Sequence, residues 1–400
     1  MVEFYKIKQK SGLTILFEKR DLPIVAIMAA ARTGAAYETI RNKGIAHFFE
    51  HMVFKGPTKK RTTKEISSAI EKAGGILNAF TAEQVTNFWT KIPSKHFELG
   101  TDVIFDILEN PAFTPKELER ERGVVLSEID RYHDLPEEYL FDKIKEFLYA
   151  KPFGTSILGL KETVSKLKRS DLLNWHKYYD PKNMIICIVG SANLKEIDNM
   201  AKKYFGKNKG IKIPEARIKL LMKNKEVIER RQGLDQTHFA LGFHRPSLSN
   251  KMRYASEVFN AILGEGMSSV LFQEVREKRG WAYLIHSYLQ REKDYGYCTV
   301  YAGVEKKNIK KVKEIILKEI KGMAKAKARD LDEAKEQKIG NWQLSLESCN
   351  NTATNLIFQE MATKAEDFYD YPEKIYDVKL QDIKKLAKIK NYCNMVLVPD

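Results

Sequence analysis

The segment from His47 to His51 reads His-Phe-Phe-Glu-His, and this feature most narrows what the 400-residue chain can form. On a helix, positions i and i+4 share one face and lie roughly 5–6 Å apart at Cβ, so both imidazoles can reach one ion. Most other side chains of the segment are apolar, which predicts a buried helix: Ile45, Phe48, Phe49, Met52 and Phe54. Two imidazoles and a carboxylate are costly in such a place without partners. A metal ion would satisfy them.

The same motif indicates which metal it is and what it does. His47 and His51 would be two zinc ligands, and Glu50, on the neighbouring flank, could take a proton from water at the metal. A catalytic zinc needs three protein ligands and one open position, so a third ligand is expected elsewhere in the chain. On the motif alone, histidines that stand at this spacing by chance remain the alternative.

The composition is that of a soluble globular protein, with 43% hydrophobic and 30% charged residues, and the length suggests two or three domains. The net charge of +15 is compatible with nucleic acid, an anionic membrane or an acidic substrate. However, lysines between Glu305 and Lys325 alternate at helical spacing with an apolar stripe, which is typical of a solvated helix face. We therefore expect no nucleic-acid partner and no membrane partner.

The N-terminal residues and the cysteines suggest a cytoplasmic protein, unless a leader sequence was removed. Residues 1–7 enter strand-like alternation directly, and no apolar run approaches membrane-spanning length. The four cysteines are widely separated and form no C-x-x-C pair, so we interpret them as reduced thiols that neither bind zinc nor cross-link: Cys187, Cys298, Cys349 and Cys393.

Strand and helix signals alternate in an α+β pattern. Strands are predicted at 3–8, 13–18, 23–32, 76–81, 84–92 and 183–190, and helices at the zinc motif, after Thr63, after Ser94, after Thr114-Pro115 and at 193–205. A basic stretch without clear periodicity, 207–225, separates the halves.

The two halves end alike. Asp171-Leu172 followed by Asn183 to Ile186 recurs, 211 residues later, as Asp382-Ile383 followed by Asn394 to Leu397. The match is short, and coincidence is the alternative, but a half-length offset fits a duplicated domain. We predict two similar domains, each a mixed, mostly antiparallel sheet packed with helices, at 1–210 and 227–400, with a linker at 211–226.

A second acidic segment carries a family resemblance. Arg120-Glu121 to Ser127-Glu128 places two carboxylates seven residues apart, nearly two helical turns, and Glu128 stands 77 positions after His51. Together with the histidine motif, this resembles the pitrilysin-type, inverted-motif zinc metallopeptidases, over essentially the whole chain. The resemblance implies that Glu128 is the third zinc ligand and that Glu121 orients a histidine ring.

Two more stretches are similar to that family. Gly74 to Thr81 resembles the edge strand that holds a substrate peptide, which implies substrate binding at Asn78, Ala79 and Phe80, although core packing is an equal alternative for Phe80. Gly264 to Ser269 with Arg276 and Tyr283 resembles the loop and the Arg/Tyr pair that bind substrate and the developing oxyanion.

The resemblance implies a zinc endopeptidase, with one zinc per chain, that hydrolyses peptides or unfolded polypeptides in a dimeric chamber. The longest relatives fuse four such domains, whereas this chain has room for two, so a homodimer is expected. Because both residue sets are present, each zinc would face Arg276 and Tyr283 of the partner subunit. A non-catalytic scaffold, or a subunit that requires a different partner chain, is the alternative.

Overall fold

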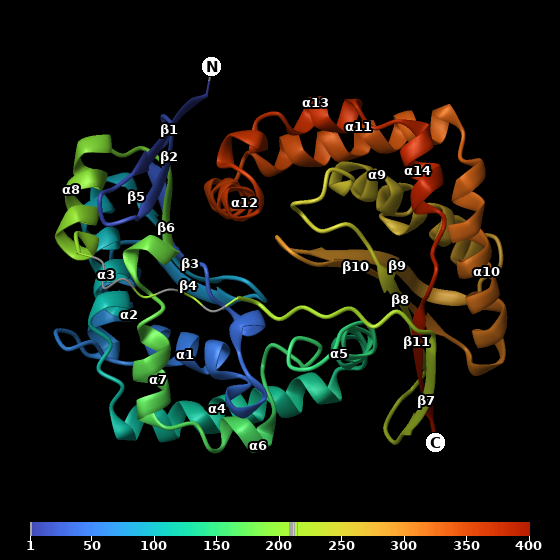
Figure 1. Cartoon of the computed structure of the whole chain (residues 1–400), viewed down its shortest axis with the longest axis horizontal. Coiled ribbons are helices and arrows are strands. Elements are labelled where there is room, and N and C mark those ends of the chain that lie inside the picture. The colour runs from blue at the N-terminus through green and yellow to red at the C-terminus, as the bar shows by residue number, and fades with distance from the viewer. Residues whose placement is uncertain (1, 208–210, 212, 214) are drawn as a thin grey trace. The chain divides into compact units, whose positions relative to one another are not determined.

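The computed structural model describes residues 2–207, 211, 213 and 215–400, and its chain packs into two compact units (Figure 1). The first unit comprises Met1–Asp130, Thr155–Arg217 and Ser345–Ala365, and the second comprises Arg131–Gly154, Ile218–Leu344 and Glu366–Asp400. Two segments therefore belong to the unit built mainly from the other half of the chain. The predicted domains and linker include residues 1, 208–210, 212 and 214, which lie outside the described residues.

The first unit is built on a six-stranded sheet in the order β1-β2-β6-β3-β5-β4. β2 and β6 are parallel and the other neighbours are antiparallel. β6 is buried along its whole length, as its sequence MIICIVG predicts for a central strand. β4 pairs with β5 and forms one edge. The strands are β1 (Glu3–Lys8), β2 (Thr14–Lys19), β3 (Ile24–Ala31), β4 (Ile76–Thr81), β5 (Thr86–Pro93) and β6 (Met184–Gly190).

Helices cover both faces of this sheet. Alternate residues of β3, including Ile27 and Ala29, belong to a core that also contains residues of α1 and α3, whereas Met28 on the other face accepts a contact from Thr354 Oγ1 of α12, 3.7 Å away. The helices that contribute residues to the first unit are α1 (Ile45–Phe54), α2 (Thr63–Lys72), α3 (Phe97–Glu109), α4 (Pro115–Asp134), α6 (Lys161–Val164), α7 (Arg169–His176), α8 (Leu194–Phe205) and α12 (Cys349–Ala362).

The second unit has a five-stranded sheet in the order β7-β11-β8-β10-β9. Its strands are β7 (Lys225–Arg231), β8 (Thr237–His244), β9 (Ala282–Arg291), β10 (Gly296–Val304) and β11 (Cys393–Pro399). Its helices are α5 (Pro136–Leu148), α9 (Arg253–Gly264), α10 (Ile309–Gly322), α11 (Ala328–Ser345), α13 (Tyr371–Tyr376) and α14 (Leu380–Leu386), with a π-helical turn η5 (Phe272–Glu277). Short 3-10 turns are η1 (Ala35–Tyr37), η2 (Ile40–Asn42), η3 (Ser94–His96), η4 (Pro181–Asn183), η6 (Lys306–Asn308), η7 (Met323–Lys325) and η8 (Ala365–Phe368).

The two sheets share one topology. Without β1, the first order reads β2-β6-β3-β5-β4, and the second repeats it as β7-β11-β8-β10-β9. In each repeat the first and last strands along the chain are parallel neighbours: β2 with β6, and β7 with β11. In the repeated sequence that ends the two halves, Asp171-Leu172 and Asp382-Ile383 lie on α7 and α14, and Met184 to Ile186 and Asn394 to Leu397 lie on β6 and β11. The predicted α+β class, with two similar mixed sheets packed with helices, is confirmed.

The repeats exchange a helix. α5 follows the long helix α4 and packs against β8 and β11 of the second sheet, while α12 follows the long helix α11 and packs against β3 and β6 of the first. Each sheet is thus covered partly by a segment from the other half of the sequence. Periodicity could not reveal this, because it shows which face of a helix is apolar and not which sheet that face meets.

Local signals set most boundaries, with one correction. α2 is capped by Thr62 and not by Thr63. The Thr62 hydroxyl accepts a hydrogen bond from the backbone N–H of Glu65, and the Glu65 carboxylate accepts one from the backbone N–H of Thr62. No helix among the described residues is long and apolar enough to cross a membrane. The four cysteines are free and buried.

The exchanged helix gives a test of this packing. Leu356 of α12 is fully buried, so Leu356→Ala should destabilise the first unit by about 2–5 kcal/mol, the usual loss for truncating a buried leucine. Faster amide hydrogen exchange in β3 and β6 would report the loss. Leu344, which is 72% exposed at the end of α11, provides the control, and Leu344→Ala should leave exchange unchanged. Equal effects of the two variants would contradict the packing described.

Candidate metal centre

Helix α1 presents its two histidines on one face. The His47 and His51 rings lie 4.7 Å apart between centroids, at 73° to each other. His47 is buried and His51 partly buried, because the rest of the helix packs into the core of the first unit. The helix begins sharply after Gly44, whose φ of 97° is a left-handed conformation that favours glycine.

Helix α4 brings a carboxylate to these rings. Glu128 Oε2 lies 3.6 Å from His47 Nε2 and 3.3 Å from His51 Nε2. One potential ligand atom from each of His47, His51 and Glu128 lies within 4.8 Å of the other two, and this is the metal-compatible group among residues 2–207, 211, 213 and 215–400. The structure therefore brings together all three residues that the sequence and the family resemblance predicted as ligands.

The donor set fits a zinc ion. Two imidazole nitrogens and one carboxylate oxygen are common zinc donors, and three protein donors leave a coordination position open. Glu121, also on α4, lies with Oε2 3.4 Å from His51 Nδ1, so the other ring nitrogen is directed toward Glu128. Such an outer carboxylate fixes the ring orientation of a metal-binding histidine.

The electrostatics of the site agree with this fit. Burial, and then the charge of His51, lower the pKa of His47 to about 4, so His47 is neutral at pH 7, as a ligand must be. Burial alone would lower the pKa of His51, but its bonds to Glu121 and Glu128 outweigh this and raise the pKa to about 9. The two carboxylates that raise the pKa of His51 would equally favour a divalent cation at this place.

Glu50 stands beside the ligand group and not within it. Its Oε2 accepts a hydrogen bond of 2.7 Å from Thr81 Oγ1 on β4. Burial raises the pKa of Glu50, which makes its carboxylate a stronger proton acceptor than an exposed one. The arrangement suits a general base held next to an edge strand.

The predicted substrate-binding strand is β4, and its side chains divide between two faces. Thr81 faces Glu50, and Phe80 stacks on Phe358 of α12, with 6.4 Å between ring centroids and 5° between planes. Asn78 Oδ1 accepts the N–H of Ala79. Among the described strands β4 is paired with β5 and stands at the edge of the sheet, a position that can accept a further strand. Substrate binding by Asn78, Ala79 and Phe80 stays a prediction.

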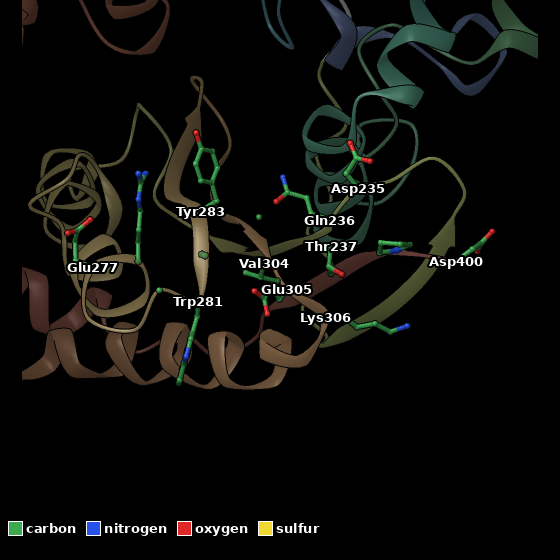
Figure 2. Close-up of a pocket in the computed structure, with 15 residues that line it drawn as sticks. Asp235, Gln236, Thr237, Glu277, Trp281, Tyr283, Val304, Glu305, Lys306 and Asp400 are labelled. Atoms are coloured by element: carbon green, nitrogen blue, oxygen red, sulfur yellow. The ribbon is translucent and has the colours of Figure 1, made fainter.

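Arg276 and Tyr283 meet in the second unit. The Arg276 guanidinium, on η5, lies 5.4 Å from the ring centre of Tyr283 on β9, and Tyr283 is 77% exposed. Both line a pocket of about 760 Å³, and Figure 2 shows Tyr283 and Trp281 pointing in opposite directions from this region. Trp281 lies against α10, with Lys311 Nζ 5.3 Å from its ring centre. The predicted pair is thus assembled and accessible.

Comparisons with known proteins agree with this geometry. Residues 15–161 match the family described as Insulinase (Peptidase family M16), and residues 166–338 match the one described as Peptidase M16 inactive domain. The uncharacterized zinc protease YmxG of Bacillus subtilis is 32% identical over 352 residues, which are 86% of this chain and 84% of that protein. An uncharacterized zinc protease of Rickettsia bellii is 34% identical over 346 residues, 85% of this chain and 83% of that protein.

Solved structures share the fold. A protease from Helicobacter pylori matches with a TM-score of 0.92 at 23% identity, and an M16-like peptidase from Alicyclobacillus acidocaldarius with 0.86 at 18%, covering 100% of this chain in each case and 100% and 99% of those chains. These likenesses concern the fold alone. Together with the family matches and the zinc-protease relatives, they define a two-domain M16-type protein. The chain belongs to the pitrilysin-type peptidase family M16, in its short form.

Sequence reasoning missed three polar residues that the structure places around α1. Thr81 bonds Glu50, while Glu38 and Lys43 form a buried pair at the helix start. For Thr81 a signal existed, because a hydroxyl two residues after Ala79 faces the same side of the strand. For Glu38 and Lys43 none existed, since charged residues in a loop ordinarily remain in solvent.

Glu121 and Glu128, the two α4 carboxylates next to the histidines, are expected to affect zinc affinity to different degrees. Glu121→Gln should weaken zinc affinity about 10–100-fold, the usual result of losing an outer hydrogen-bond partner of a ligand. Glu128→Gln, which removes an anionic ligand, should weaken it more. Competition with a chromophoric chelator measures both. Glu119→Gln is the control on the same helix, where the side chain is 69% exposed, and it should bind as the parent does. Equal affinities of Glu128→Gln and Glu119→Gln would exclude Glu128 as a ligand.

Proposed function

We propose that this protein is a zinc-dependent endopeptidase that hydrolyses peptides or unstructured polypeptides, with one zinc per chain held by His47, His51 and Glu128. The observation that carries the proposal is the convergence of two helices on one point: α1 supplies both imidazoles and α4 supplies the carboxylate, with the three ligand atoms within 4.8 Å. The names of the relatives, which are zinc proteases, support the same metal and the same class of reaction.

In the proposed hydrolysis, the zinc ion and the side chains of the protein make different contributions. Zinc bound by this donor set supplies Lewis acidity, which polarises a carbonyl and lowers the pKa of water toward about 7. Glu50 takes the proton of the attacking water and returns it to the departing amine, so that the peptide C–N bond breaks and a carboxylate and an amine are released. Thr81 holds the Glu50 carboxylate in place through the bond from its hydroxyl. Glu121 holds the His51 ring.

Edge strand β4 suits an extended substrate. A peptide that adds to an open strand binds through its backbone and must itself be extended, which favours unstructured polypeptides over folded domains. Thr81, at the end of β4, bonds Glu50, so a peptide on this strand would run close to the base. Side chains at Asn78, Ala79 and Phe80 would then influence which residues are accepted.

Arg276 and Tyr283 are proposed to donate hydrogen bonds to the substrate carbonyl or to the tetrahedral oxyanion. Both are donors, both line one pocket, and Tyr283 is largely exposed. The same chain carries the proposed ligands, the proposed base and this pair. We therefore propose a dimer of two identical chains, since no second kind of chain is needed to supply any of these residues. A cytoplasmic location and the absence of nucleic-acid and membrane partners stay predictions.

A non-catalytic or partner-dependent subunit is the second candidate, and one observation favours it. Residues 166–338 match an inactive-domain description, and α9, which takes the place of α1 in the second repeat, contains no histidine. The histidines are missing from the helix of the second repeat, whereas α1 in the first repeat carries both histidines and Glu50. Purified protein that binds zinc but cleaves an unstructured peptide only after a second polypeptide is added would favour this candidate.

Glu50→Gln tests the role of the base. The variant should bind zinc as the parent does, because Glu50 is not among the ligands, yet its kcat should fall about 10²–10⁴-fold, the range that a positioned general base contributes. Zinc content and hydrolysis of a fluorogenic unstructured peptide are measured on the same sample. Near-normal turnover by this variant would remove Glu50 from the role.

Tyr283→Phe tests the proposed oxyanion donor. Removing one such hydroxyl should lower kcat about 10²–10³-fold and change KM little, since the bond is made chiefly in the transition state. Steady-state kinetics on the same peptide measure the effect. Tyr288→Phe, on the same strand and 45% exposed, is the matched control and should keep the parent kcat. A Tyr283→Phe variant with parental kcat would show that the hydroxyl has no part in the reaction.

A further inference from the structure

An ion pair is enclosed in the first unit next to the start of α1. Lys43 Nζ lies 2.9 Å from Glu38 Oε2, and the two side chains are 1% and 0% exposed. Neither residue is part of the proposed ligand group or of the proton transfer. A buried pair of this kind often contributes little net stability, because removing two charges from water offsets their attraction. Its role is therefore to be sought in what it holds in position.

One end of the pair holds helix α1. Glu38 Oε1 accepts the backbone N–H of Ala46, at 2.8 Å, and Ala46 directly precedes His47. This carboxylate thus satisfies one of the N–H groups that a helix leaves free at its first turn. The Lys43 carbonyl accepts a bond of 2.5 Å from Thr163 Oγ1, which fixes the residue before the turn at Gly44.

The other end holds the strand beside Glu50. Lys43 Nζ donates to the carbonyl of Ala35, at 3.2 Å, and the N–H of Ala35 donates to the carbonyl of Ala82, at 3.1 Å. Ala82 directly follows Thr81, whose hydroxyl donates to Glu50. The contacts therefore close a ring that runs from α1 through Glu38, Lys43 and Ala35 to the end of β4 and back to α1.

We propose that Glu38 and Lys43 are positioning residues that set the Glu50 carboxylate against the end of edge strand β4. The proposal rests on the peptidase function given above. It explains why two charges are kept at 1% and 0% exposure: a buried pair bonded to two backbone elements fixes their spacing through directional bonds, which apolar side chains do not form. The pair acts through the ring and does not touch the substrate.

The test uses full-length protein and a variant that removes the charges together. Glu38→Gln with Lys43→Met leaves no unpaired buried charge and keeps an amide oxygen for the Ala46 N–H, but it breaks the link to Ala35. Amide exchange is measured on metal-free protein, and kcat, KM and zinc content on the zinc-loaded protein. Glu18→Gln is the control, since Glu18 lies on β2, away from the ring, is 5% exposed and is paired with Arg20, which directly follows that strand.

The double variant should exchange the Ala35 amide at least tenfold faster than the parent, with Val103 in α3 unchanged. Its kcat should fall at least tenfold, with KM within twofold and one zinc retained, whereas Glu18→Gln keeps the parent kcat. Unchanged exchange at Ala35, or faster exchange with an unchanged kcat, would overturn the proposal. If the parent itself cleaves no peptide, the proposed function is wrong. The exchange data then decide by themselves whether the bond from Lys43 to the Ala35 carbonyl holds this segment in place.

Thr81→Val cuts the same ring at its other end without changing the buried pair. If both changes act through one ring, the combined variant should lose less kcat than the product of the separate losses. Losses that multiply would show independent effects and would overturn the proposal. Thr81→Val alone should lower kcat with KM within twofold. A parental kcat of this single variant would show that the end of β4 does not position Glu50, and would overturn the proposal even where the double variant folds poorly.

Discussion

The first unit depends on how it satisfies polar groups inside an apolar core. Its central helix buries His47 and Glu50 and half-buries His51, and each of these groups would destabilise the fold without a partner. The partners come from separate elements: Glu128 and Glu121 from α4, and Thr81 from β4. The same contacts that allow α1 to be buried therefore also bring the two histidines, their carboxylate partners and Glu50 together.

The duplicated architecture explains how one repeat can specialise. Both sheets have the same strand order, and each accepts a helix from the other half of the chain. In the first repeat the helix after β3 carries the histidine motif, whereas its counterpart α9, which follows β8, is largely buried and contains no histidine. The second repeat instead carries Arg276, which is partly buried, and Tyr283, which is exposed, in contact with each other. The two repeats thus share a strand order and differ in the side chains that they present.

Much of this could be predicted from the sequence, for reasons that differ between features. The histidine motif and the strand periods are local, so they predicted the helix, the sheet strands and two ligands. Glu128 was reached only through a family resemblance, because nothing local indicates which distant acid returns to a helix. The exchange of α5 and α12 and the buried pair of Glu38 and Lys43 depend on tertiary packing, which the order of residues along the chain does not encode in any short pattern. The strand period places Thr81 on the same side as Ala79, but only the packing of α1 against β4 shows that its hydroxyl meets Glu50.

The central claim is that one zinc ion is bound by His47 and His51 of α1 together with Glu128 of α4. X-ray absorption at the zinc edge on the purified protein, or anomalous scattering from a zinc-loaded crystal, measures this directly. The account predicts one zinc per chain, with two nitrogen donors at about 2.0–2.1 Å and protein oxygen at about 2.0–2.2 Å, the nitrogen donors being lost on replacement of His47 and His51. Zinc bound by sulfur, or an anomalous peak remote from both imidazoles, would contradict it.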